Sequence, residues 1–96
     1  MVKSSKRNKR GDPQKQYQKA VKAFDAQRYI EAILWLKRAA ELKHPEAIYQ
    51  LGCCYEKGIG VVQDEFIAIN YYIRAQKLGH AEAKERVARL TGREIK

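Results

Sequence analysis

Two adjacent cysteines, Cys53 and Cys54, are the residues best suited to redox or metal chemistry. Successive helical residues point about 100° apart, so these thiols cannot form an unstrained disulfide with each other. The chain has no further cysteine, and a zinc site built from two cysteine pairs is therefore excluded. We expect Cys54 to pack as a small apolar residue, Cys53 to be more open, and both to stay reduced, as is usual in the cytosol.

Two histidines, His44 and His80, could in principle ligate a metal ion. Their nearest carboxylates, Glu46 and Glu82, follow two residues later, on the first turn of an expected helix. An acid at that position is explained by its favourable interaction with the helix dipole. We therefore interpret the histidines as turn-forming residues and predict no metal ion.

The segment Gly58–Gln63 contains glycines but does not match a phosphate-binding loop. A nucleotide fingerprint needs a preceding strand and a third glycine, and the segment has neither. The sequence also places no nucleophile–base pair and no acidic dyad in one pocket. We therefore expect a protein that is not an enzyme and uses no cofactor.

The net charge of +9 is unevenly distributed. We expect residues 1–12 to form a disordered basic tail and residues 93–96 a second, short polar tail, because such segments cannot bury apolar surface. The first tail could contact the phosphates of a nucleic acid or an acidic partner, or it could serve only for solubility or targeting. Its basic residues are Lys3, Lys6, Arg7, Lys9 and Arg10.

No apolar run approaches the ~20 residues that a membrane-spanning helix needs. The N-terminal charges are not followed by the apolar stretch of a secretory signal. We expect a cytoplasmic protein with no membrane partner, or a fragment whose signal has been removed.

The candidate residues lie on a sequence that repeats itself every 36 residues. When Tyr29–Ala47 is aligned with Glu65–Ala83, the same residues recur in order. A period between 20 and 50 residues is typical of stacked-repeat proteins, which present a surface to a partner more often than they enclose a catalytic pocket. The identical pairs are Ala32/Ala68, Ile33/Ile69, Arg38/Arg74, Ala39/Ala75, Leu42/Leu78, His44/His80, Glu46/Glu82 and Ala47/Ala83.

The spacing of apolar residues predicts helices and no strand, since no segment alternates with period two for long enough. Gly52 lies inside an expected helix, where glycine costs about 1 kcal/mol relative to alanine, so we expect a close approach by another element there. We expect Tyr49 to face outward. The expected helices span about 13–26, 29–43, 45–58, 64–78 and 80–91, and the fourth should turn Phe66, Ile69, Tyr72, Ala75 and Leu78 inward.

The second half of the chain carries a known signature at the right spacing. Its residues are Ala47, Leu51, Gly52, Tyr55, Gly58, Gly60, Val61, Asp64, Ala68, Tyr71, Tyr72, Arg74, Ala75, Gly79 and Ala81. This segment resembles one full Sel-one-like repeat, a relative of the tetratricopeptide repeat. The preceding segment, Lys15–His44, has a loop about five residues shorter and has Lys43 in place of the usual glycine. The last helix resembles half of a third repeat.

The resemblance implies an all-α fold, a right-handed α-α superhelix of two helical hairpins and a C-terminal capping helix. The expected repeat domain covers residues 13–92. Unit one would span 13–44, unit two 45–79, and the capping half-repeat 80–92.

By the same resemblance, the protein would be a non-catalytic interaction or scaffold module that binds a peptide or protein surface in its concave groove. The first helix of each hairpin would line that groove. Carried over by register, the groove residues are Gln18, Lys22, Asp25, Tyr49, Cys53, Glu56, Glu85 and Arg89.

Two alternatives stay open. The basic tail could bind nucleic acid or a ribonucleoprotein, or exposed apolar area on the helix that carries Trp35 could drive self-association. We accordingly expect a monomer or a weak homo-oligomer.

Overall fold

The computed structural model describes residues 11–92, and it contains helices and no strands within that range. This confirms the all-α fold expected from the sequence. None of the helices in the described part of the chain is long and apolar enough to cross a membrane. The helices are α1 (Pro13–Asp25), α2 (Tyr29–Glu41), α3 (Pro45–Lys57), α4 (Glu65–Lys77) and α5 (Ala81–Thr91).

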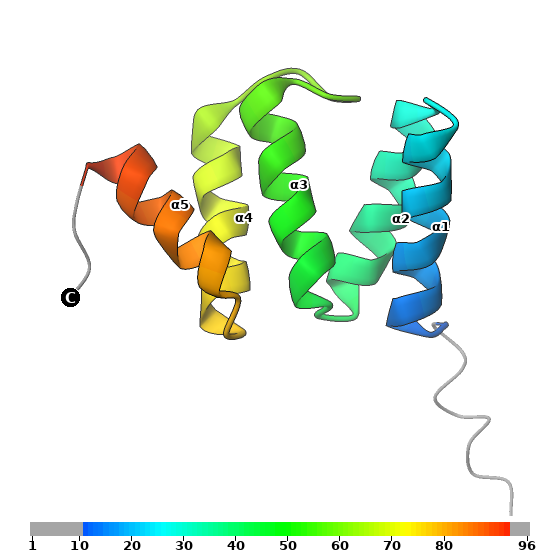
Figure 1. Ribbon diagram of the computed structural model, residues 1–96, viewed down its shortest axis with the longest axis horizontal. Coiled ribbons are helices and arrows are strands. Elements are labelled where there is room, and N and C mark those ends of the chain that lie inside the picture. Colours follow the sequence, from blue (N-terminus) through cyan, green and yellow to red (C-terminus); the bar gives the residue numbers. More distant parts are fainter. Residues whose placement is uncertain (1–10, 93–96) are drawn as a thin grey trace, which may run out of the picture.

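The helices form two hairpins and a final single helix, arranged in a row (Figure 1). The α1–α2 hairpin lies at one end, α3 lies in the middle, and α4 and α5 follow. Each helix packs on the next one along the chain, α1 on α2, α2 on α3, α3 on α4 and α4 on α5. This serial packing is what a stack of repeats requires, because each unit contacts only its neighbours.

Side chains at the helix starts satisfy backbone N–H groups that have no partner inside the helix. The Asp12 carboxylate accepts from the N–H of Gln14 at 3.0 Å, and Asp64 accepts from the N–H of Ile67 at 3.1 Å. These are ordinary acidic caps. His44 and His80 occupy the same position before α3 and α5, so they cap helices in addition to forming turns.

The core lies between the helices and is apolar. Its largest fully buried side chains are Tyr72, Leu36, Ile48 and Leu51. Gly52 confirms the predicted close approach, since a Cβ atom placed there would lie 2.5 Å from the Tyr72 ring. The glycine in α3 therefore makes room for a buried aromatic side chain of α4.

Two residues expected to face inward do not. Phe66 is 82% exposed and Leu78 is 42% exposed, whereas Tyr72 and Ala75 are fully buried as expected. Phe66 precedes the buried Ala68 by two residues, which places it about 200° around α4 from the packed face. The inward prediction was wrong for both residues, because Phe66 projects from the side of α4 opposite the packed face and Leu78 lies just beyond the last residue of the helix.

Candidate partner-binding groove

The turn before α3 is tied to α1 by His44. The backbone N–H of Ala47 donates to Nδ1 of His44 at 3.1 Å, so the ring proton lies on Nε2. That nitrogen is 2.8 Å from Oε1 of Gln14, and the ring stacks on Tyr17 at a centroid distance of 4.8 Å. One side chain thus caps α3 and holds it against two residues of α1.

The same arrangement recurs before α5. The N–H of Ala83 donates to Nδ1 of His80 at 3.2 Å, and Nε2 lies 2.7 Å from Oε1 of Glu46. The His80 ring stacks on Tyr49 at 4.3 Å. Glu46 therefore partners the histidine of the next turn, a role that the helix-dipole interpretation missed because the two residues are far apart in sequence.

Tyr49 is buried, which corrects the expectation that it faces outward. Its exposed fraction is 7%, because the His80 ring covers it and Tyr72 lies 5.6 Å away. Burial, reinforced by the neighbouring Cys53, raises the pKa of Tyr49 to about 12, so the phenol is neutral at physiological pH. Tyr49 contributes to the wall of the groove and does not project from it.

The two histidine caps, with the tyrosines on which they stack, form junctions that show which residues of α1 and α3 are equivalent. Tyr17 matches Tyr49, since both stack on a histidine cap. Val21 and Phe24 then match Cys53 and Glu56, because α1 and α3 have the same length and both begin at a proline. The register used for the first hairpin in the sequence analysis was therefore one residue too far along the chain.

As a result, the three residues expected from α1 do not line one common hollow. Gln18, Lys22 and Asp25 are all exposed. Asp25 lines a hollow between α1 and α3, whereas Lys22 lines a different hollow between α1 and α2. Gln18 lines neither of these two hollows.

Two adjoining hollows lie along the first helices of the hairpins, and we call them together the groove. They share Phe24 and Gln50. The smaller has a volume of about 240 Å³ and is lined by Tyr17, Val21, Phe24, Asp25 and Gln50. The larger has a volume of about 350 Å³ and is lined by Phe24, Tyr29, Tyr49, Gln50, Cys53, Cys54, Lys57, Ile59 and Arg86.

Glu56 lines neither hollow, but it holds Arg86, which lines the larger one, in a polar cluster. The Tyr72 hydroxyl donates to Oε1 of Glu56 at 2.6 Å, and Nη1 of Arg86 donates to the same oxygen at 3.2 Å. Burial, together with hydrogen bonding to Cys53 and Glu56, raises the pKa of Tyr72 well above its ordinary value. The cluster links α3, α4 and α5.

The cluster shows one groove residue that the sequence analysis missed. Arg86 lies 5.5 Å from the centroid of the Tyr49 ring and reaches Glu56, yet only Glu85 and Arg89 were expected from α5. Arg89 touches Glu56 at the edge of ion-pair distance, 4.0 Å, and Glu85 is exposed. Arg86 is the neighbour of the expected Glu85, and nothing in a single sequence distinguishes it from the other charged residues of α5.

The cysteines behave as expected. Both are free, Cys54 is buried and Cys53 is half-buried. Burial raises the pKa of Cys54 to about 11, so little thiolate forms at neutral pH. Over residues 11–92, no group of three metal-ligating side chains could hold a metal ion. The basic residues of the N-terminal tail lie outside the described residues.

The serial helix packing, the recurring histidine junctions and the groove along the first helices define a helical-repeat protein. The model of the family described as "Sel1 repeat" matches residues 25–44 and 45–80, more than half of the chain. The chain belongs to the Sel1 repeat family, which confirms the resemblance inferred from its signature residues.

A solved structure supports the same assignment. A Sel1 repeat protein from Oxalobacter formigenes aligns with a TM-score of 0.73 and 35% sequence identity, over 80% of this chain and 61% of its own.

Two similar curated proteins come from Schizosaccharomyces pombe. Chitin synthase regulatory factor 3 of Schizosaccharomyces pombe is 46% identical over 57 residues, and regulatory factor 2 of the same yeast is 40% identical over 58. These matches cover 59% and 60% of this chain, but only 6% and 11% of the relatives. The chain therefore spans a small part of the length of the curated relatives it matches.

Proposed function

We propose that the chain is a non-catalytic interaction module that binds a peptide or protein surface in the groove between α1, α3 and α5. The observation that carries this proposal is the shape and lining of the groove. Its two hollows adjoin along α1 and α3, where they share Phe24 and Gln50.

The chemistry of the lining suits a protein ligand. Val21 and Tyr29 are 39% and 41% exposed, so they offer apolar and aromatic surface that a partner could cover. Asp25, Gln50 and Lys57 supply an acid, an amide and a base around that surface. Apolar centres with polar rims are typical of protein interfaces.

The relatives support a regulatory or scaffold role, since two of them are named regulatory factors. Because the chain matches only a small part of each, we extend to it the general role of binding another protein, and neither chitin synthase as a partner nor any pathway. The nucleic-acid alternative depends on the basic tail and stays a prediction.

The proposal is tested at Val21, whose side chain is exposed in the groove. Tyr49 is unsuitable because it is buried, and its replacement would destabilise the fold. We expect Val21→Asp to lose the proteins that the wild-type chain retains from native extract. For a purified partner, calorimetry should show binding about tenfold weaker, since burial of a valine contributes roughly 1.5 kcal/mol or more.

Val62→Asp is the matched control, because Val62 is 87% exposed in the α3–α4 loop and lines neither hollow of the groove. It should retain the wild-type partners. If Val21→Asp and Val62→Asp retain the same proteins as the wild type, with the same affinities, the groove is not the binding surface.

A further inference from the structure

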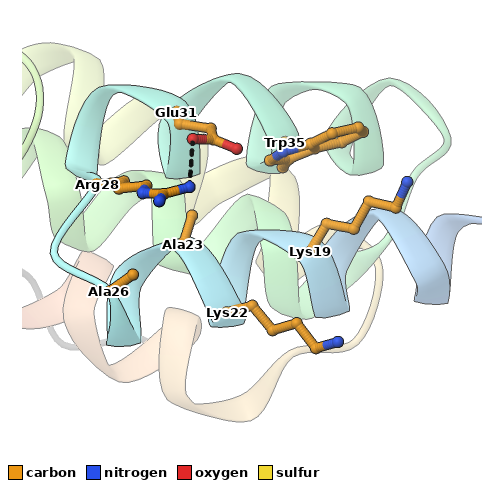
Figure 2. Close-up of a pocket in the computed structure, with 7 residues that line it drawn as sticks. All are labelled: Lys19, Lys22, Ala23, Ala26, Arg28, Glu31 and Trp35. Atoms are coloured by element: carbon orange, nitrogen blue, oxygen red, sulfur yellow. Dashed lines mark ion pairs between the residues drawn. The ribbon is translucent and has the colours of Figure 1, made fainter.

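A third hollow lies on the outer edge of the α1–α2 hairpin, and no residue of α3 lines it. Figure 2 shows it between the two helices, with lysines of α1 on one side and Trp35 of α2 on the other. We call it the edge hollow. It has a volume of about 220 Å³ and is lined by Lys19, Lys22, Ala23, Ala26, Arg28, Glu31 and Trp35.

The edge hollow is cationic. Three of its lining residues are basic and one is acidic. The single carboxylate, Glu31, forms an exposed ion pair with Arg28 at 3.8 Å. Within the described part of the chain, neither Lys19 nor Lys22 has a carboxylate at ion-pair distance. Two lysines therefore line the hollow without an acidic partner there.

A comparison of the hairpins indicates what kind of ligand could cover this edge. Under the correspondence fixed by the histidine junctions, Lys19 and Lys22 match Leu51 and Cys54. Those two residues are buried in α3, which packs on α2. An apolar helix stacked on the edge hollow would bury two lysines without compensation, which is costly. An acidic segment would neutralise them.

Trp35 favours a peptide over a nucleic acid. Its ring already has Nζ of Lys19 at 4.6 Å and the guanidinium of Arg38 at 4.8 Å from the centroid. A nucleobase that stacked on the ring would compete with both cations. Carboxylates could instead pair with the cations at the rim, while an apolar side chain covers Ala23 and Ala26.

From these observations we propose that the edge hollow binds an acidic peptide segment containing apolar residues. Glutamate or aspartate side chains pair with Lys19, Lys22 and Arg28, and an apolar side chain packs into the hollow beside Trp35. This site is separate from the groove, and either could fail without the other.

The chain carries its own reporter for this site, because Trp35 is its only tryptophan. The probe is a synthetic peptide of glutamates interspersed with leucines, titrated into the full chain at low salt. We expect the peptide to change the Trp35 emission. We expect Lys19→Glu/Lys22→Glu to weaken binding by at least about tenfold, since charge-assisted hydrogen bonds are among the stronger polar contacts.

Lys77→Glu/Lys84→Glu is the matched control, because it changes the net charge equally at exposed residues that do not line the hollow. The basic tail contributes equally to both variants and cancels in the comparison. Equal losses in the two double variants, or no change in Trp35 emission on saturation, would overturn the proposal. A thermal melt of each variant verifies its fold.

Glu31→Gln gives a test in the opposite direction, since it removes the only carboxylate of the hollow. We expect it to tighten peptide binding by about two- to fivefold, the scale of an exposed charge contact. A single-stranded oligonucleotide serves as the competing ligand. If it binds more tightly than the peptide and Lys19→Glu/Lys22→Glu abolishes its binding, the hollow takes phosphates and the peptide proposal is wrong.

Discussion

The histidine caps show how one residue can do two structural tasks. His44 uses Nδ1 to cap α3 and uses its other ring nitrogen and its ring face to hold α1. A second proton would have to bind Nδ1, the atom that accepts the Ala47 N–H. Protonation and capping are therefore mutually exclusive at this residue.

This arrangement predicts a dependence of stability on pH. Burial lowers the pKa of His44 below its ordinary value of 6.5, although the carboxylates of Glu46 and Asp12 partly oppose the shift. The unfolded chain then binds the proton more tightly than the folded one, and acid favours unfolding. The contribution is complete above about pH 6.5 and is lost as the pH falls below that value.

We therefore expect the free energy of unfolding, measured in urea, to fall between pH 7.5 and 5.5, and to fall less steeply in His44→Asn. Asparagine is a good N-cap and does not titrate. The slope with pH is the readout, because the variant also loses the Tyr17 stacking and starts from a lower stability. Identical slopes in the two proteins would show that His44 has the same pKa in the folded and the unfolded chain, which contradicts the prediction.

At the scale of the element, the two hairpins end their second helices with the same backbone geometry and different residues. Gly79 follows α4 with φ of 92°, and Lys43 follows α2 with φ of 61°. This left-handed conformation is natural for glycine and costs other residues on the order of 1 kcal/mol. The α1–α2 hairpin therefore keeps the turn of the family but with a less suitable residue.

We expect Lys43→Gly to stabilise the chain by roughly 0.5–1 kcal/mol, the strain relieved less the entropy that glycine loses on folding. Urea unfolding followed by circular dichroism measures the change. The same substitution in a helix, at the exposed Lys84 of α5, should instead destabilise by up to about 1 kcal/mol. A loss of stability in Lys43→Gly would mean that the lysine side chain makes a contact worth more than the strain.

The sequence predicted the elements well, because period, caps and glycines are local signals. Gly52 indicated a close approach, and the Tyr72 ring provides it. The predictions from sequence failed for side chains whose burial or position depends on a residue far away in the chain. Tyr49 is buried because the His80 ring covers it and Tyr72 lies beside it, and Arg86 joins the groove because α5 places it next to Glu56.

The groove residues predicted for α1 were wrong by one position for a similar reason. The loop after α1 is shorter than the loop after α3, so the repeat period of the second helices does not apply to the first helices. Only the stacked pairs Tyr17–His44 and Tyr49–His80 fix the correspondence, and they join residues of different elements.

At the scale of the whole molecule, the α3–α4 loop helps to hold the two hairpins together. It extends toward the α1–α2 hairpin in Figure 1. A Cβ atom on Gly60 would lie 2.8 Å from the Tyr29 carbonyl oxygen and 2.9 Å from Cγ1 of Ile33. The backbone of the loop therefore touches the start of α2, beside the larger hollow of the groove, which Tyr29 lines.

This contact predicts that Gly60→Ala is more damaging than a glycine substitution elsewhere. Gly60 has φ of 74°, so alanine suffers backbone strain there and also collides with α2. We expect a loss of about 2–4 kcal/mol in urea unfolding, from left-handed strain and overpacking together.

Gly79→Ala separates the two effects, because Gly79 has φ of 92° and nothing within 4 Å of its Cβ position. It should lose only about 0.5–1 kcal/mol, the strain less the entropy that replacing glycine recovers. Because the collision pushes the loop away from Tyr29, Gly60→Ala should also weaken the binding of ligands in the groove. It should leave the binding of the acidic peptide at the edge hollow unchanged. Equal losses of stability in the two variants would show that the loop yields freely and does not join the hairpins.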